Sequence, residues 1–183
     1  MVSRVDVMIL GLLKEEARHG YDLVREMEQR GLMRWAPASK VAVYKALPRL
    51  EERGFLTSWM EKDRSMPEKR VYALTVDGEE KLLDMLYALC SSQESLRLDL
   101  GVGLAFVAGM DGEEAVEALE KRRGYLREWE RRLSSELDIL KGITDDIYTS
   151  IIEHEISMYR KEAAWINDII VTISGSEKKN GGG

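Results

Sequence analysis

Residues 39–75 read SKVAVYKALPRLEERGFLTSWMEKDRSMPEKRVYALT, and their pattern is the most informative in the chain. Its first part has the apolar spacing of a short helix, and Gly54 is placed to end that helix. Two runs rich in strand-forming residues follow, 55–60 and 70–75, and a polar segment with a proline, 61–67, separates them. A helix followed directly by a projecting hairpin is the arrangement of a winged helix-turn-helix, in which the helix enters a DNA groove and the hairpin reaches the backbone.

Two more helices are predicted upstream of this stretch. The second covers residues 21–30, with Gly31 placed just beyond its end, and Ser39 is placed to cap the third. The first helix is marked by one apolar stripe: Val5, Met8, Ile9, Leu12 and Leu13. The core face predicted for the third helix consists of Val43, Ala46, Leu47 and Leu50. Residues 1–77 are therefore expected to form a winged helix-turn-helix domain.

The remainder of the chain is helical by pattern, so the predicted fold class is mainly α with a small β-hairpin. Asp111 and Glu114 form an acidic variant of the capping box, which opens a long helix to about residue 141. We expect residues 78–173 to form a helical dimerisation domain that also holds any effector, and residues 174–183 to be a disordered tail. Seven-residue and 4-3 apolar spacings assign these residues to the dimer: Leu126, Trp129, Leu133, Ile152, Ile156, Tyr159, Ala163, Ile166 and Ile170. Packing within one chain is the simpler alternative for such helices.

Charge is unevenly distributed along the 183 residues. The whole chain has a net charge of −6, whereas residues 1–76 carry 14 Lys and Arg against 11 Asp and Glu, a net of +3. Phosphate binding depends on local charge, so the acidic remainder does not exclude DNA. No apolar run approaches the ~18 residues of a membrane span, and the first residues read as a core helix and not as a signal peptide. A single cysteine, Cys90, excludes an intramolecular disulfide and fits the cytoplasm.

The residues expected to contact DNA lie in the third helix and the hairpin. For Lys45 and Arg49 the alternative is an ordinary solvated helix face, but the order of three short helices and a hairpin favours DNA recognition. The full set is Ser39, Lys40, Val41, Ala42, Tyr44, Lys45 and Arg49 in the helix, with Lys62, Arg64, Lys69 and Arg70 in the hairpin. Pro48 either kinks the helix or ends its groove-facing part near Leu47, so residues 39–45 are the expected reading segment.

Catalytic chemistry has little support in the sequence. His19 and His154 are far apart, Cys90 lies on an apolar helical face, and neither a phosphate-binding loop nor a metal-binding HExxH motif is present. We therefore expect no enzymatic activity, no metal and no cofactor.

Four motifs follow one another in residues 1–78: ILGLL (9–13), HGYDL (19–23), VYKALPRLEERGFL (43–56) and KRVYALTVDG (69–78). In this order they resemble the PadR family of winged-helix transcriptional regulators. The later helices resemble the longer C-terminal domain of the phenolic-acid-regulator branch, in length, helix pattern and an EAAWI motif (162–166). The resemblance implies a homodimer, usually a repressor, whose C-terminal helices interlock across the two-fold axis. Many members are released from DNA by small aromatic or lipophilic compounds, while others act without a known ligand.

We therefore expect a cytoplasmic, homodimeric repressor that binds a near-palindromic operator in double-stranded DNA. A small aromatic or lipophilic effector is a further expected partner, and a membrane is not. The alternative is a winged-helix dimer that acts as a protein-interaction module without binding DNA. Trp35, Trp129 and Trp165 are candidates for an aromatic-lined ligand pocket, although core or interface packing is the simpler interpretation.

Overall fold

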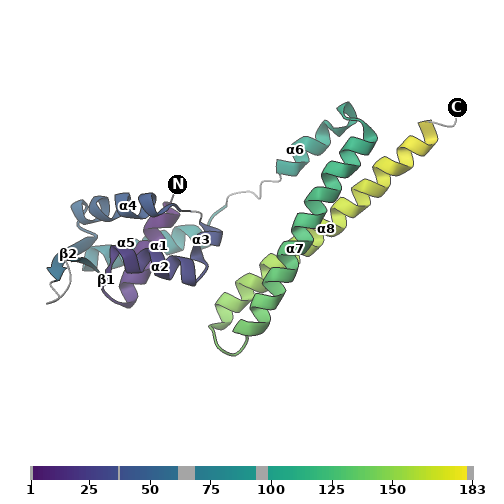
Figure 1. The fold of residues 1–183 in the computed structure, drawn as a ribbon. Coiled ribbons are helices and arrows are strands. Elements are labelled where there is room, and N and C mark those ends of the chain that lie inside the picture. Colours follow the sequence, from purple (N-terminus) through teal and green to yellow (C-terminus); the bar gives the residue numbers. More distant parts are fainter. Residues whose placement is uncertain (1, 37, 62–68, 94–98, 181–183) are drawn as a thin grey trace. The chain divides into compact units, whose positions relative to one another are not determined.

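The chain divides into two compact units, residues 1–95 and residues 96–183. A computed structural model describes residues 2–36, 38–61, 69–93 and 99–180 (Figure 1). None of the helices in these ranges combines the length and the apolar character that crossing a bilayer requires.

Short, capped helices build the first unit. They are α1 (Arg4–Glu15), α2 (Gly20–Gln29), α3 (Leu32–Trp35), α4 (Lys40–Glu52) and α5 (Val76–Cys90). The Ser39 hydroxyl accepts the N–H of Ala42 at 3.1 Å, which confirms the predicted N-cap of α4. Gly31 follows the last residue of the α2 cap with φ of 65°, a left-handed conformation that favours glycine and turns the chain into α3.

The core of the first unit lies between the apolar faces of α1, α2 and α4. The predicted core face of α4 is confirmed, because Val43, Ala46, Leu47 and Leu50 are all buried. They pack with the apolar stripe of α1 and with Leu23 and Met27 of α2. One carboxylate, Asp6, is buried in the same region.

A three-stranded antiparallel sheet lies beside these helices in the order β1-β3-β2. Strands β2 (Leu56–Glu61) and β3 (Lys69–Leu74) form the predicted hairpin, with Ser58 opposite Tyr72 and Met60 opposite Arg70. Most of the predicted hairpin loop lies in residues 62–68, outside the described part of the chain. Strand β1 (Arg18–His19) was not predicted, because two residues are too short to show a period-2 pattern.

Helix α5 belongs to the first unit. It packs on α1, and an ion pair of 2.5 Å joins Lys14 to Glu79. The Thr75 hydroxyl links this helix to the hairpin, because it donates to the carbonyl of Gly54 and accepts the N–H of Gly78. The predicted boundary lies after residue 77, whereas the division between the two compact units falls after residue 95.

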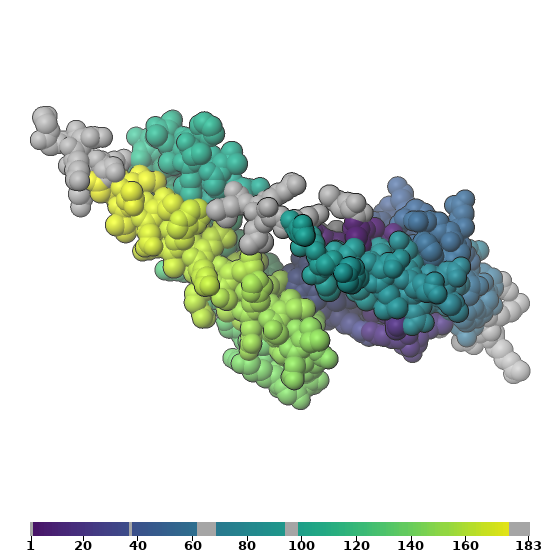
Figure 2. Space-filling model, turned by 180° about the vertical axis from the view of Figure 1, so that it is seen from behind, coloured from purple at the N-terminus to yellow at the C-terminus, as the bar shows by residue number. Residues whose placement is uncertain are grey.

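The second unit is a hairpin of two long helices, preceded by α6 (Asp99–Ala105) and a 3-10 turn, η1 (Val107–Gly109). Helices α7 (Gly112–Leu140) and α8 (Asp146–Asn180) lie side by side in both views (Figures 1 and 2). The Asp111 side chain accepts the N–H groups of Glu113 and Glu114, which confirms the predicted cap of α7. Gly142, with φ of 79°, supplies the left-handed residue of the turn between the helices.

Helix α8 extends further than the sequence predicted. It continues to Asn180, so it includes most of the segment expected to be a disordered tail, and only residues 181–183 of that segment lie outside the described ranges. Gly175 favours an end to the helix at this point, but no proline interrupts the segment, and the Glu and Lys residues that follow are good helix formers.

Candidate nucleic-acid interface

The exposed side of α4 carries most of the residues predicted to read DNA. Val41 and Tyr44 are 60% and 48% exposed although both are large and apolar in character. Lys40, Lys45 and Pro48 are exposed beside them, and Ala42 is half-buried. This surface therefore presents two cations, an aliphatic side chain and a phenol on one short helix, the mixture that phosphate and base-edge contacts use. We call α4 the recognition helix.

The recognition helix remains continuous through Pro48. It runs from Lys40 to Glu52 with Pro48 inside it. The structure thus contains no helix end near Leu47, although the proline removes one backbone donor from the exposed side. Pro48 is exposed, so its ring is accommodated outside the core.

Helix α2 supports the start of the recognition helix at close range. A Cβ atom added to Gly20 would lie 3.1 Å from Tyr44 Cε1 and 3.1 Å from Leu47 Cδ1. Lys40 Nζ lies 3.4 Å from a carboxylate oxygen of Glu28, and both side chains are exposed. Gly20 was not among the predicted residues, because a single glycine in the sequence does not indicate what packs against it.

Arg49 makes a structural contact as well as lying at the exposed side. Its Nη2 is 2.5 Å from Oδ1 of Asp6, and Asp6 is only 4% exposed. The pair joins α1 to the recognition helix across 43 residues of sequence. Arg49, which the sequence suggested as a backbone contact, therefore also neutralises a buried carboxylate.

The β2–β3 hairpin, which we call the wing, is connected to the recognition helix by Glu51. The Ser58 hydroxyl donates to Glu51 Oε1 at 2.5 Å, and Arg70 Nη1 lies 3.6 Å from Glu51 Oε2. Lys69 and Arg70 are exposed on β3, as a phosphate contact requires. Lys62 and Arg64, the other two predicted wing contacts, lie outside the described residues.

His19 connects β1 to the wing. Its Nδ1 lies 3.2 Å from the main-chain oxygen of Arg70, and its Nε2 lies 3.4 Å from a carboxylate oxygen of Glu61. The imidazole thus contacts both strands of the hairpin near the point where its loop begins.

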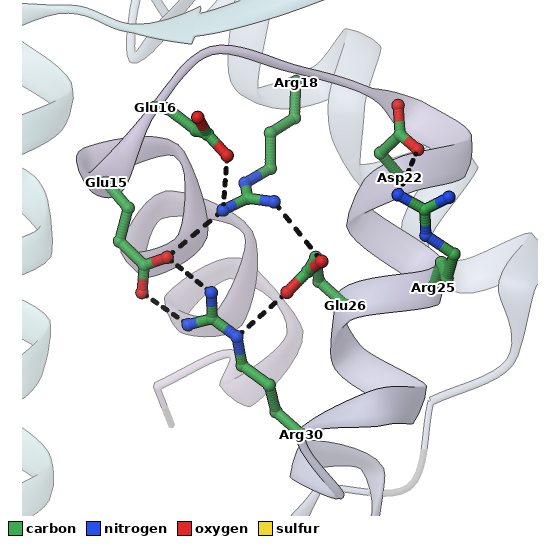
Figure 3. Close-up of polar contacts among 7 residues, drawn as sticks. All are labelled: Glu15, Glu16, Arg18, Asp22, Arg25, Glu26 and Arg30. Carbon is green, nitrogen blue, oxygen red and sulfur yellow. Dashed lines mark hydrogen bonds and ion pairs between the residues drawn. The ribbon is translucent and has the colours of Figure 1, made fainter. Parts of the chain in front are cut away.

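A network of charged side chains holds α2 against α1 (Figure 3). Arg30 binds both carboxylate oxygens of Glu15, at 2.6 and 2.7 Å, and also contacts Glu26 at 3.0 Å. Arg18, whose side chain is largely buried, contacts Glu15, Glu16 and Glu26 at 2.9 to 3.6 Å. The hydrogen bonds from Arg30 lower the pKa of the Glu15 carboxyl, and the same contact raises the pKa of Arg30.

The residues assigned to the dimer lie in the interior of the second unit. Leu126, Ala163, Ile166 and Ile170 form one buried cluster between α7 and α8, and Leu133, Ile152 and Ile156 form another. Trp129 and Tyr159 are partly buried beside them and stack with 6.4 Å between ring centroids. The intrachain alternative therefore accounts for the burial of the apolar seam.

The three candidate tryptophans do not share one cluster. Trp35 lies in the first unit, with the Arg34 guanidinium 5.4 Å from its ring centroid. Trp129 packs with the cluster around Leu133, whereas Trp165 packs with the cluster around Leu126. Among the described residues, no group of three or more His, Cys, Asp or Glu side chains is placed to hold a metal ion.

Helices α1, α2 and α4, of which α4 has an exposed side and is followed by the wing, define the class of protein: a winged helix-turn-helix DNA-binding protein. Residues 9–84 match the model of the transcriptional regulator PadR-like family, and this match supports a PadR-like transcriptional regulator.

Two relatives are similar over most of the chain. The negative transcriptional regulator PadR of Bacillus subtilis is 22% identical over 173 residues, which cover 90% of this chain and 94% of the relative. Its structure in complex with operator DNA has a TM-score of 0.78 at 20% identity, covering 92% of this chain and 98% of the other. The virulence activator AphA of Vibrio cholerae has a TM-score of 0.77 at 16% identity, covering 94% and 99%. At these identities the structural likeness establishes the fold.

Proposed function

We propose that the chain is a homodimeric transcriptional regulator that represses by binding a near-palindromic operator. The observation that carries this proposal is the exposed surface of the recognition helix, where Val41, Tyr44 and Lys45 lie together beside a wing. A core helix would bury such apolar side chains, and a merely solvated helix face does not favour them. The Bacillus subtilis relative was solved in complex with operator DNA, which supports the same use of the surface here.

Binding and discrimination are expected from different parts of this surface. Lys40, Lys45 and the wing residues Lys69 and Arg70 would neutralise phosphates, and these contacts supply most of the binding free energy. The Ser39 hydroxyl accepts one N–H within the helix, and its own proton stays available to a phosphate oxygen. Val41 and Ala42 would contact thymine methyl groups, so discrimination between sequences is assigned to residues 39–45.

A second apolar stripe on α8 supports dimerisation. Ile147, Ile151 and Met158 are spaced four and seven residues apart, which places them along one side of the helix. Ile147 and Met158 are 72% and 48% exposed, whereas the residues first assigned to the dimer are mostly buried within the chain. We therefore assign the contact with a second copy to this outer stripe. A two-fold dimer would present two recognition helices to half-sites ~34–36 Å apart.

Repression and ligand release are inferred from the relatives. The Bacillus subtilis protein is named a negative regulator and was also solved in complex with p-coumaric acid, with a TM-score of 0.74 to this chain, whereas AphA is named an activator. A reporter gene under the target promoter would separate repression from activation. Quenching of tryptophan fluorescence by phenolic acids, followed by loss of DNA binding at the same concentrations, would support a releasing ligand.

Lys45 provides the direct test of DNA recognition. Lys45→Ala should weaken binding to the promoter of the gene that encodes this chain. It should also reduce the slope of log K against log[salt] by ~1.8, because each bound dimer loses two phosphate contacts, one from each copy. Lys121→Ala, an exposed lysine of α7, removes the same charge elsewhere and should have little effect. Gel shifts at two salt concentrations, with scrambled DNA as competitor, measure both quantities.

Equal affinity of the wild-type chain for promoter and scrambled DNA would contradict sequence-specific recognition. Failure to bind any DNA at low salt, together with a stable protein partner, would favour the interaction-module alternative.

A further inference from the structure

Glu51 is a carboxylate at the edge of the surface that we assign to DNA. It lies in the last turn of the recognition helix, and its side chain is 30% exposed. It accepts the Ser58 hydroxyl from β2 and contacts the Arg70 guanidinium from β3. One side chain of the recognition helix therefore contacts both strands of the wing.

The register of the hairpin explains how both contacts reach the same carboxylate. Ser58 is opposite Tyr72, and Met60 is opposite Arg70, so Ser58 and Arg70 are diagonal neighbours on one face of the sheet. Tyr72 is part of the core, so this face is turned toward the helices. A slip of one residue between β2 and β3 would move Ser58 and Arg70 to opposite faces and separate them.

The two contacts differ in strength and in consequence. The Ser58–Glu51 hydrogen bond is short and has an ionised acceptor, which makes it the stronger of the two. The Arg70–Glu51 pair is longer and half-exposed, so a phosphate oxygen can compete for the guanidinium. In the absence of DNA, the same carboxylate orients the wing and partly neutralises one of its cations.

We propose that Glu51 is a positioning residue that sets the orientation of the wing relative to the recognition helix and thereby determines how well the chain discriminates its operator from other DNA. This inference rests on the proposed function. By holding Arg70 in one orientation, Glu51 favours DNA whose phosphates lie where that orientation places the guanidinium, and we assign this backbone geometry to the operator. DNA of another sequence then forms a weaker contact with Arg70. Its negative charge also reduces binding to DNA that lacks the operator.

The test uses Glu51→Gln, which keeps the shape of the side chain and an oxygen that accepts from Ser58 while removing the charge. Binding to non-operator DNA should tighten more than binding to the operator, so that the ratio of the two dissociation constants falls about threefold. Glu52→Gln is the matched control, because Glu52 is the neighbouring exposed carboxylate of the same helix. It changes the net charge equally and should tighten both dissociation constants by the same factor, leaving the ratio unchanged.

Two further variants test whether Glu51 acts on DNA discrimination through its contacts with Ser58 and Arg70. Ser58→Ala changes no charge and should lower the same ratio without altering the salt dependence of binding. In an Arg70→Ala background, Glu51→Gln should change the ratio much less, because the guanidinium through which Glu51 acts is gone.

The outcomes separate this inference from the proposed function. A wild-type chain that binds promoter and scrambled DNA equally would overturn the proposed function and the inference with it. If the wild-type chain is selective but Glu51→Gln and Glu52→Gln give the same ratio of the two dissociation constants, the inference is overturned and the proposed function stands. An undiminished effect of Glu51→Gln in the Arg70→Ala background would also overturn it.

Discussion

Arg49 and Arg70 lie on the side of the first unit that we assign to DNA, yet each guanidinium contacts a carboxylate of the same chain. Because Asp6 is buried, removing Arg49 would leave a carboxylate in the core without this partner, which is costly. Loss of DNA binding in an Arg49 variant would therefore reflect folding as well as phosphate contact. Lys45, which is exposed, is the clearer probe of the DNA-facing surface.

Gly78 is a residue at which the packing tolerates no side chain. A Cβ atom there would lie 2.0 Å from the main-chain oxygen of Phe55 and 2.9 Å from Leu74 Cδ1. Because a backbone atom cannot move aside as a flexible side chain can, Gly78→Ala should lower the free energy of unfolding by about 3 kcal/mol. Denaturant unfolding followed by circular dichroism measures this change.

Gly124 is the matched control for that substitution. It lies inside α7, and no atom lies within 4 Å of the position that its Cβ would occupy. Gly124→Ala should therefore raise the free energy of unfolding by about 0.5–1 kcal/mol, because alanine is the better helix former. Similar effects of the two substitutions would contradict the packing described for Gly78.

At the scale of the elements, the recognition helix contains Pro48, which interrupts its backbone hydrogen bonds. Pro48→Ala restores a backbone donor for the carbonyl of Tyr44 and removes the clash of the ring with it. We expect the free energy of unfolding to rise by about 2 kcal/mol. Thermal melts measure this stabilisation, and a lower melting temperature would show that Pro48 makes a contact that alanine cannot replace.

The pairing of α1 with α2 predicts a pH dependence of stability. The pKa of Glu15 is lowered in the folded chain by hydrogen bonds from Arg30, so the folded state binds this proton less readily than the unfolded state does. The stabilisation is therefore complete above the ordinary glutamate pKa and is lost as the pH falls through the lowered one. Glu15→Gln should be less stable than the wild type at neutral pH.

The difference between these two chains should narrow in acid, below about pH 4. Urea unfolding at both pH values measures it. Glu117→Gln, an exposed carboxylate of α7, controls for the removal of one charge. A difference between wild type and Glu15→Gln that does not change with pH would show that the Arg30 contact does not stabilise the fold.

At the scale of the whole molecule, the proposed dimer depends on surface that the second unit leaves exposed. Met158→Glu adds a charge to the outer stripe of α8 without touching the buried clusters between α7 and α8. We expect it to produce a monomer by sedimentation and to weaken operator binding at least about tenfold, because two half-sites are no longer bound by one assembly. Val171→Glu, exposed on the same helix outside the stripe, should leave the dimer intact.

A Met158→Glu chain that remains dimeric would place the dimer contact elsewhere. The exposed apolar residues of α5, which include Leu83, Leu86 and Tyr87, would then be the next surface to substitute.

Local patterns were sufficient to predict much of this chain. The apolar spacing of α1 and α4 identified their core faces, and the caps at Ser39 and Asp111 located the starts of two helices. These features depend on residues within one or two helical turns, so they can be read directly from the sequence. The exposed positions of Val41, Tyr44 and Lys45 follow from the same periodicity.

Contacts between distant segments were decided only by the tertiary structure. The pairing of β1 with β3, the Asp6–Arg49 ion pair and the contacts of Glu51 with the wing have no periodic signature, because each joins residues that meet only once the helices have packed. The apolar seam of α8 shows the same contrast between a local pattern and a contact that depends on packing. Its 4-3 spacing indicated a buried face, but the identity of the covering helix, α7 of the same chain, depended on the turn at Gly142 and not on the spacing itself. Apolar spacing along the chain is thus enough to identify which faces are buried. The segment that covers each face follows only from how the helices pack, because hydrophobic burial is non-directional and many partners can cover one apolar stripe.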